Sequence, residues 1–285
     1  MTYTTHVDLH MHSNISDGSD SPEELLAKVK EAGIEMFALT DHDDVRGCIR
    51  VLNALKDGDP RFITGIEFSC VDEEGKYHIL GYGYDINAAP INDTVSRVHQ
   101  YRMSKARARV DAVRNDYGFD IPEEEVDGFL SLPNPGKPHL ANLLIKHGYA
   151  QSREQAFRDI LDKIPFKAQY IRPEEAIDAI IKSGGIPVLA HPVYGSGDQL
   201  ILGEEMEERL KRLIGFGLKG VEAFYSGFTF KMTDQMLSLA DRFGLYVTAG
   251  SDYHGTNKMI PLGDNGIEDA CLPQGMKNFL DLFGG

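Results

Sequence analysis

The sequence has little cysteine and no long apolar run. Its three cysteines, Cys48, Cys70 and Cys271, lie far apart and form no CxxC pair. We therefore interpret them as reduced and mostly buried, which excludes a disulfide framework and a thiolate metal site. No segment has the length of a membrane-spanning helix, and the start, MTYTTHVDLH, has no basic segment followed by an apolar one. We expect no membrane association, no signal peptide and a cytoplasmic location.

Positive charge is also scarce. The chain carries 29 lysines and arginines against 44 aspartates and glutamates, a formal net charge of −15. This balance argues against general binding to nucleic acid or anionic lipid. A small anionic substrate stays open, because bound metal ions dominate the field of a local site. Residues 97–110 are an exception, with five basic residues and no acidic one: Arg97, Arg102, Lys105, Arg107 and Arg109.

Strand-like and helix-like segments alternate in both halves of the chain. Strands are predicted at residues 6–10, 36–40, 61–69, 77–84, 185–190, 220–224 and 245–250. Helices are predicted between most of them, and the first opens with a capping serine, Ser21, followed by Pro22. Seven strands connected largely by helices predict a parallel, barrel-like α/β fold. Residues 66–83 interrupt the alternation with a predicted hairpin.

The middle of the chain is different. Residues 89–170 show no strand pattern and are helical and polar in character. We interpret them as an inserted helical subdomain. The predicted barrel then consists of residues 1–88 and 171–285.

The first strand ends in a histidine pair. His10 and His12 are two residues apart, so in an extended chain both side chains project to one face and can reach one ion. Taken alone, the pair is equally compatible with two surface histidines on a loop.

The pattern recurs at other strand ends, which favours a metal site. Potential ligands follow or end the predicted strands: Asp17, His42, Glu67, His191, Asp252 and His254. His78 lies on the returning strand of the predicted hairpin, on the same face as Glu67. Loops at the carboxyl ends of barrel strands form active sites. These nine candidates exceed the shell of one ion, and histidines mixed with carboxylates suit Zn, Mn or Fe.

Six segments carry a family resemblance: DLHMHSNISDG, LTDHD, GIEFS, HILGYG, LAHP and GSDYHG. In this order they closely resemble the PHP (polymerase and histidinol phosphatase) family, across residues 7–83 and 173–255. The chain is most similar to stand-alone PHP phosphoesterases with a helical insert that act on nucleotides. The resemblance implies a distorted seven-stranded barrel, similar to a TIM barrel, and a centre of three divalent metal ions.

The resemblance also implies a ligand for each position. The first ion would take His10, His12, Glu67 and Asp252, the second Glu67, His78 and His191, and the third Asp17, His42 and His254. Asp17 is a histidine in some relatives. Six of these residues would be catalytic, namely Asp17, His42, Glu67, His191, Asp252 and His254. A metal-bridging hydroxide would then attack the phosphoester.

Two further sets of residues are predicted to assist. Asp8, Asp41 and Asp43 are placed to orient ligand histidines. Substrate contacts are expected in the insert, where Arg102, Lys105 and Arg109 share one helical face. Lys137 and His139 lie in a Gly-Lys-Pro-His segment that resembles a motif of these relatives, although His139 has a helix cap as its alternative. A solvated basic face is the alternative for the other three.

The expected activity is hydrolysis of a phosphomonoester of a nucleotide, a 5′-mononucleotide such as AMP or a nucleoside 3′,5′-bisphosphate. Three alternatives remain open: a histidinol-phosphate phosphatase, a short-oligonucleotide exonuclease, and an inactive structural PHP module. The basic insert favours a more anionic substrate than histidinol phosphate. The overall acidity weakens the exonuclease, and the complete ligand set argues against the inactive module.

Overall fold

The computed structural model describes residues 3–132, 134–165, 169–195, 199–267 and 272–284. It divides into two compact units, a barrel unit formed by Met1–Val95 with Ile171–Gly285, and an insert formed by Ser96–Tyr170. The division falls inside helix α3 (Ala89–Asn115), whose first residue is the predicted start of the insert.

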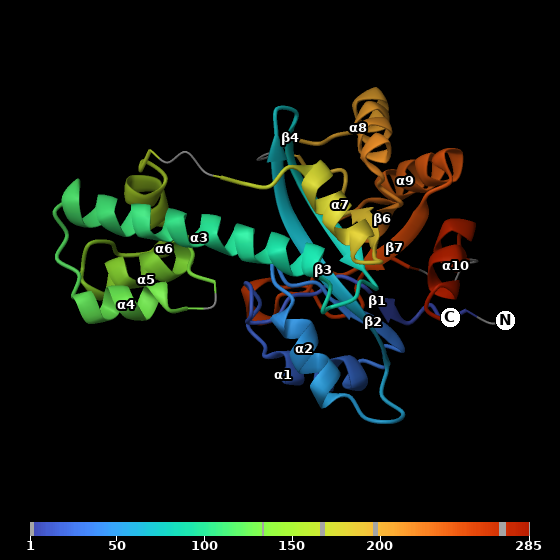
Figure 1. The fold of residues 1–285 in the computed structure, drawn as a ribbon, viewed down its shortest axis with the longest axis horizontal. Coiled ribbons are helices and arrows are strands. Elements are labelled where there is room, and N and C mark those ends of the chain that lie inside the picture. Colours follow the sequence, from blue (N-terminus) through green and yellow to red (C-terminus); the bar gives the residue numbers. More distant parts are fainter. Residues whose placement is uncertain (1–2, 133, 166–168, 196–198, 268–271, 285) are drawn as a thin grey trace. The chain divides into compact units, whose positions relative to one another are not determined.

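The barrel unit contains one seven-stranded sheet, whose strands neighbour one another in chain order (Figure 1). The strands are β1 (Val7–Asp8), β2 (Met36–Leu39), β3 (Arg61–Asp72), β4 (Gly75–Tyr82), β5 (Ile186–Leu189), β6 (Gly220–Tyr225) and β7 (Tyr246–Gly250). Neighbours are parallel except at β4, which is antiparallel to β3 and β5. Just past β1, the amide of Leu9 donates to the carbonyl of Ala249 at 2.9 Å, which brings β7 beside β1. The predicted distorted seven-stranded barrel is confirmed, and it is nearly closed.

The β3–β4 hairpin is the irregular part of the barrel. Its strands pair from Gly65 with Tyr82 to Asp72 with Gly75, so β3 extends past the predicted end at residue 69. Two consequences follow for the site. Glu67 lies inside β3 rather than at its end, and His78 comes back along β4 opposite Ser69.

Helices flank the strands of the barrel unit. They are α1 (Pro22–Glu31), α2 (Arg46–Ala54), α7 (Pro173–Lys182), α8 (Gly203–Phe216), α9 (Phe230–Phe243) and α10 (Gln274–Asp281), with a 3₁₀ turn η2 (Gly255–Asn257). The cap predicted for α1 is present, because the Ser21 hydroxyl accepts from the Glu24 amide while Glu24 accepts from the Ser21 amide. Helix α9 begins at Phe230, and the Thr229 hydroxyl caps it by accepting from the amide of Met232.

Large apolar side chains fill the barrel unit. Phe37, Phe68 and Phe279 are fully buried, and all four residues of β2 are buried. Strands covered on both faces are typical of parallel α/β sheets. Tyr82 is also fully buried, and its hydroxyl donates to the Leu9 carbonyl at 2.9 Å, which links β4 to the end of β1. The core thereby holds fixed the strand ends that carry the polar residues.

The insert is helical and has its own hydrophobic core. It contains most of α3, with α4 (Glu123–Leu130), α5 (Lys137–Lys146), α6 (Arg153–Ala156) and the π-helix η1 (Phe157–Leu161) (Figure 1). Val113, Leu140 and Leu144 are completely buried in that core. The polar sequence character of this region therefore conceals an apolar stripe on each of several helices.

Two sequence expectations concern exposure and the membrane. Cys48 and Cys70 are free and buried, as predicted, whereas Cys271 lies outside the described residues. In the described parts of the chain, every helix is too short or too polar to span a bilayer.

Candidate metal centre

All nine predicted ligands lie in the barrel unit. His10 and His12 follow β1, His42 follows β2, and His191 follows β5. Asp17 lies in the loop after β1, Glu67 and His78 lie in the hairpin strands, and Asp252 and His254 follow β7. The parallel strands deliver their ligands to one rim of the barrel because their carboxyl ends meet there.

Glu67 lies at the centre of the cluster, with a side chain that is 1% exposed. Its Oε2 atom is 3.3 Å from His10 Nε2, 3.2 Å from His12 Nε2 and 3.2 Å from His42 Nδ1. Asp252 Oδ1 completes this side of the cluster, 3.2 Å from His12 Nε2 and 3.6 Å from His10 Nε2. The four ligands that the resemblance implies for a first ion are thus brought together.

The other oxygen of Glu67 faces a second pair of rings. Glu67 Oε1 lies 2.8 Å from His78 Nδ1 and 3.1 Å from His191 Nε2, and those two nitrogens are 3.2 Å apart. One carboxylate therefore stands between two histidine groups, each facing a different oxygen. This is the geometry that a bridging ligand between two ions requires.

Asp17 organises a third group. Its Oδ1 lies 3.3 Å from His254 Nε2, and its Oδ2 lies 3.9 Å from His42 Nε2. His12 Nδ1 is also 3.6 Å from Asp17 Oδ1, so the grouping differs slightly from the one that the resemblance implies. His12 joins the Asp17 group as well as the first, and His42 also falls within one group with Glu67 and His78.

The separations fit shared cations. Two atoms that each bind a tetrahedral ion at about 2.1 Å stand about 3.4 Å apart, close to most distances in this cluster. Among the described residues, four buried ring nitrogens of three histidines have no hydrogen-bond partner: His10 Nε2, both nitrogens of His12, and His42 Nδ1. Buried polar atoms rarely lack partners, and metal ions would satisfy these. The buried histidine and carboxylate groups thus fit a centre of several metal ions.

The electrostatics of the cluster point the same way. Burial raises the pKa of the Glu67 carboxyl, but His42, His78 and His10 outweigh it and hold that pKa well below its usual value. For His12 the directions are reversed. Burial lowers the pKa of its imidazole, but Asp252 and Glu67 outweigh burial and raise that pKa to about 10. The carboxylates stay ionised and require positive charge beside them. Metal cations can supply that charge and leave the histidines neutral as ligands.

Buried aspartates support the ligand loops. Asp8 accepts from the amide and hydroxyl of Ser251 at 2.9 and 2.6 Å, and from the Gly263 amide at 2.8 Å. Asp41 accepts from the amide and hydroxyl of Ser13 at 2.8 and 2.7 Å. These contacts fix the backbone that carries His10, His12 and Asp252, so Asp8 and Asp41 act on the ligands through the main chain.

Three residues at the site have a left-handed backbone without being glycine: Asp43 (φ 56°), His191 (φ 25°) and Asp252 (φ 57°). Such a conformation costs about 1–3 kcal/mol each and persists only where the surroundings enforce it. Asp43 is held by the Ser69 amide, which donates to Asp43 Oδ1 at 3.0 Å. His191 is held by Glu222 Oε2, which accepts from its amide at 2.7 Å. The strained backbone positions thus lie just after β2, β5 and β7, at or beside predicted ligands.

This arrangement has counterparts in known proteins. The pattern of the PHP domain matches residues 8–225. The chain belongs to the PHP family. It is accordingly a metal-dependent phosphoesterase, a hydrolase of phosphoric ester bonds, as the sequence predicted.

Individual relatives span nearly the whole PHP chain. It is 30% identical over 272 residues to phosphoribosyl 1,2-cyclic phosphate 1,2-diphosphodiesterase of Eggerthella lenta, covering 89% of this chain and 96% of the relative. It is 28% identical to a 5′-3′ exoribonuclease of Haemophilus influenzae (95% and 98% covered). It is 29% identical to a 3′,5′-nucleoside bisphosphate phosphatase of Chromobacterium violaceum (87% of each). A crystal structure of a predicted metal-dependent phosphoesterase from Bifidobacterium adolescentis superimposes with a TM-score of 0.78 at 27% identity, covering 96% of this chain and 95% of that one.

The PHP barrel also contains a site residue that we did not predict from the sequence. Glu222 on β6 is completely buried, its Oε1 is 2.9 Å from His10 Nδ1, and its Oε2 accepts from the His191 amide. A hydrogen bond from His10 Nδ1–H leaves the Nε2 lone pair facing Glu67 and Asp252. The available signal was one acidic residue between apolar neighbours in a buried strand.

Lys258 and Tyr225 were also missed as partners of a ligand. The Tyr225 hydroxyl donates to Asp252 Oδ2 at 2.8 Å, and the Lys258 ammonium pairs with the same oxygen and lies 3.2 Å from the Tyr225 hydroxyl. Burial, with the Asp252 carboxylate beside it, raises the pKa of Tyr225 far above its usual value, so it stays a neutral donor. Both groups hold Oδ2 and leave Oδ1 turned toward the histidines.

The predicted substrate residues lie in the insert, where several share partners. Lys105 Nζ donates to the Tyr170 hydroxyl at 2.9 Å, and Lys137 pairs with Asp162. Burial lowers the pKa of Arg109, which also interacts electrostatically with Tyr170 and Asp162. Arg102 lies one turn before Lys105 on α3 and is half-buried. His139 Nδ1 accepts from the Gly136 amide at 3.2 Å, so the capping role is present.

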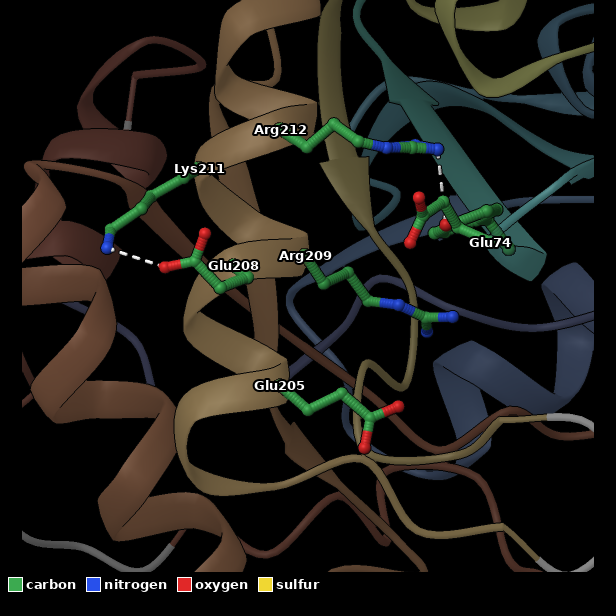
Figure 2. Close-up of a pocket in the computed structure, with 7 residues that line it drawn as sticks. Glu74, Glu205, Glu208, Arg209, Lys211 and Arg212 are labelled. Carbon is green, nitrogen blue, oxygen red and sulfur yellow. Dashed lines mark hydrogen bonds and ion pairs between the residues drawn. The ribbon is translucent and has the colours of Figure 1, made fainter.

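A separate hollow lies on the outside of the barrel unit, between α8 and the turn of the β3–β4 hairpin (Figure 2). It has a volume of about 520 Å³ and is lined by Glu74, Tyr77, Glu205, Glu208, Arg209, Lys211 and Arg212. Its lining holds as many acidic as basic side chains, and two of the basic ones are paired, Lys211 with Glu208 and Arg212 with Asp72 outside the lining. It contains no predicted site residue.

Proposed function

We propose that this PHP protein hydrolyses a phosphomonoester of a nucleotide, a 5′-mononucleotide such as AMP or a nucleoside 3′,5′-bisphosphate. The observation that supports it most is the buried Glu67 carboxylate, which faces five imidazole rings with its two oxygens. The choice of a nucleotide is supported by the Chromobacterium violaceum relative, a 3′,5′-nucleoside bisphosphate phosphatase that matches 87% of this chain.

In this proposal the centre holds three divalent ions of Mn, Zn or Fe. The ligand sets are His10, His12, Glu67 and Asp252 for the first, Glu67, His78 and His191 for the second, and Asp17, His42 and His254 for the third. Three divalent ions bring six positive charges, and three carboxylates with neutral histidines offset three of them. A site with about three net positive charges suits a phosphate dianion.

When bound, such ions lower the pKa of water toward neutrality and neutralise phosphoryl oxygens. Six ligands have a catalytic role in this proposal, because they hold the ions in position beside the phosphate: Asp17, His42, Glu67, His191, Asp252 and His254. Glu222 fixes the ring of His10 and the backbone of His191, two ligands of different ions. Tyr225 and Lys258 keep Asp252 in one orientation. The protein contributes a rigid frame that needs little rearrangement during the reaction.

The basic residues of the insert supply substrate recognition in this proposal. Arg102, Lys105, Arg109, Lys137 and His139 bind a second phosphate or the leaving nucleoside. Support comes from the shared surroundings of Lys105, Arg109 and Lys137 around Tyr170 and Asp162. Guanidinium groups bind phosphate with paired hydrogen bonds, so an arginine suits this task.

A 5′-3′ exoribonuclease acting on short oligonucleotides is the second candidate. It is favoured by the Haemophilus influenzae relative, which matches 95% of this chain. The net charge of −15 disfavours long nucleic acid, because binding of a polyanion depends on many cationic contacts.

A panel of esters separates the candidates. Protein loaded with Mn, Zn or Fe is tested on AMP, adenosine 3′,5′-bisphosphate, a phosphoribosyl cyclic phosphate, histidinol phosphate and a 5′-phosphorylated trinucleotide. The proposal predicts the highest kcat/KM on a mononucleotide or bisphosphate, and loss of this activity in Glu67→Gln. A higher kcat/KM on the trinucleotide, with release of mononucleotides, would replace it with the exoribonuclease.

A further inference from the structure

An aromatic cluster adjoins the metal centre on the barrel rim. The ring of Tyr225 lies 5.5 Å from that of His191, a predicted metal ligand, in an edge-on arrangement. Beyond it, the rings of Tyr194 and Phe228 lie 5.8 and 5.2 Å from Tyr225 and 5.8 Å from each other. Tyr225 is the last residue of β6, and Tyr194 and Phe228 lie in the loops that follow β5 and β6.

The three rings differ in exposure to solvent. This difference distinguishes a ring that packs in the interior from rings that a ligand can reach. Tyr225 is 8% exposed and its hydroxyl is engaged by Asp252, so it belongs to the interior. Tyr194 is 36% exposed and Phe228 is half-buried. Exposing the apolar surface of paired aromatic rings to water is unfavourable. Beside an active site, such rings offer faces on which a flat ligand can stack.

Hydrogen bonds hold Tyr194 in place beside Phe228. The Tyr194 hydroxyl donates to the Gly227 carbonyl at 2.6 Å, which ties the two loops together. Gly227 permits this approach, because a Cβ there would lie 2.7 Å from the Tyr194 hydroxyl oxygen and 3.0 Å from Tyr225 Cε1. The Tyr194 amide also donates to the carbonyl of His191 at 3.0 Å, so its position is fixed relative to a ligand. A preorganised surface binds at a lower entropic cost than a mobile one.

From this placement we propose that Tyr194 and Phe228 form the platform on which the base of the nucleotide stacks while its phosphate lies at the metal centre. This inference rests on the proposed function and specifies its substrate class. A ribose separates phosphate from base in a nucleotide, and the Tyr225 ring separates His191 from the platform in the protein. Stacking accepts any base, because each has a π-face, so the platform confers a preference for nucleotides rather than for one base.

The absence of tryptophan makes a direct binding test possible. Tyr194→Trp creates a single fluorescent reporter on the platform, and Phe216→Trp on α8 creates a control at a position that is likewise 36% exposed. Each is titrated with the phosphonate analogue of AMP and with ribose 5-phosphate. We expect saturable quenching of the Tyr194→Trp signal by the nucleotide analogue alone. Equal quenching by ribose 5-phosphate, or equal quenching in Phe216→Trp, would overturn the platform.

Kinetics provide an independent test. Tyr194→Ala and Phe228→Leu should each lower kcat/KM on AMP about tenfold, while kcat/KM on ribose 5-phosphate changes less than twofold. Phe228→Leu keeps apolar volume, so its loss would report the ring and not the packing, and Tyr194→Phe should retain most activity. Equal losses on both esters would overturn the platform. Wild-type protein that hydrolyses neither of these esters, nor adenosine 3′,5′-bisphosphate, would instead contradict the proposed function, whatever the fluorescence shows.

Discussion

Glu222 Oε1 lies 2.9 Å from His10 Nδ1, and neither side chain is exposed to solvent. The contact joins residues that are 212 positions apart, and it exists because the barrel brings β6 close to the end of β1. A buried carboxylate that accepts from one ring nitrogen fixes the tautomer and makes the other nitrogen a better ligand. We therefore expect Glu222 to strengthen metal binding through His10 without being a ligand itself.

Replacing Glu222 by glutamine keeps its size and removes its charge. Glu222→Gln should weaken metal binding by about 10- to 100-fold, because His10 loses its anionic partner and the backbone amide of His191 loses its carboxylate acceptor. The measurement is metal retained per chain against a competing chelator, with circular dichroism to verify folding. Unchanged retention in a folded variant would show that Glu222 is only a packing residue.

Gly250 leaves room for the contact between Glu222 and His10. A Cβ at this position would lie 2.1 Å from His10 Cβ and 2.7 Å from Glu222 Oε1. Gly250→Ala should therefore lower the free energy of unfolding by about 1–3 kcal/mol and reduce metal content. Gly215→Ala is the control, because a Cβ there meets nothing within 4 Å and α8 gains helix propensity. Equal stability of the two variants would refute the steric account.

The two carboxylates with different neighbourhoods should differ in importance. Glu67 faces five imidazoles with both oxygens, whereas Asp17 is half-exposed and interacts most closely with His254. Glu67→Gln should lower kcat/KM about tenfold further than Asp17→Asn, since only the first change affects two ions. Steady-state kinetics on AMP decide it. Similar losses in both variants would remove the argument for a bridge at Glu67.

The insert should affect selectivity and not chemistry. If Arg109 contacts a phosphate, Arg109→Ala should lower kcat/KM on adenosine 3′,5′-bisphosphate about tenfold to hundredfold, the effect of one charge-assisted hydrogen bond. Hydrolysis of a minimal aryl phosphate and metal content should not change. Arg107→Ala, at an exposed position on the same helix, is the matched control. Equal losses on both substrates would place Arg109 in the catalytic centre.

The sequence predicted the parts of the site that depend on local pattern. His10 and His12 could be recognised because a strand with period two places alternate residues on one face, and the recurrence of ligands at later strand ends needed no three-dimensional information. The hairpin was also predictable, from a turn between two β-rich segments. Its exact register was not, so Glu67 was expected at the end of its strand and lies within it.

The parts that escaped prediction depend on contacts between distant strands. Glu222 follows no ligand pattern, and its meeting with His10 requires the curvature of the whole barrel. Lys258 lies beyond the last recognisable motif and reaches Asp252 only because the chain turns back through η2. No sequence pattern pointed to Tyr194, whose ring contacts Tyr225 and whose hydroxyl donates to Gly227 in the loop after β6. The supporting residues of the site depend on tertiary packing, whereas most of the ligands follow the ends of strands and can be recognised from local pattern.

The central claim is that one buried carboxylate, Glu67, joins several metal ions into one catalytic centre. Elemental analysis of the protein, before and after dialysis against chelator, tests it most directly when paired with activity on AMP. We predict close to three transition-metal ions per chain in active wild-type protein, a loss of at least two ions together in Glu67→Gln, and restored activity when metal is returned to the wild type. Full activity with a single ion per chain, or an unchanged metal content in Glu67→Gln, would contradict the account.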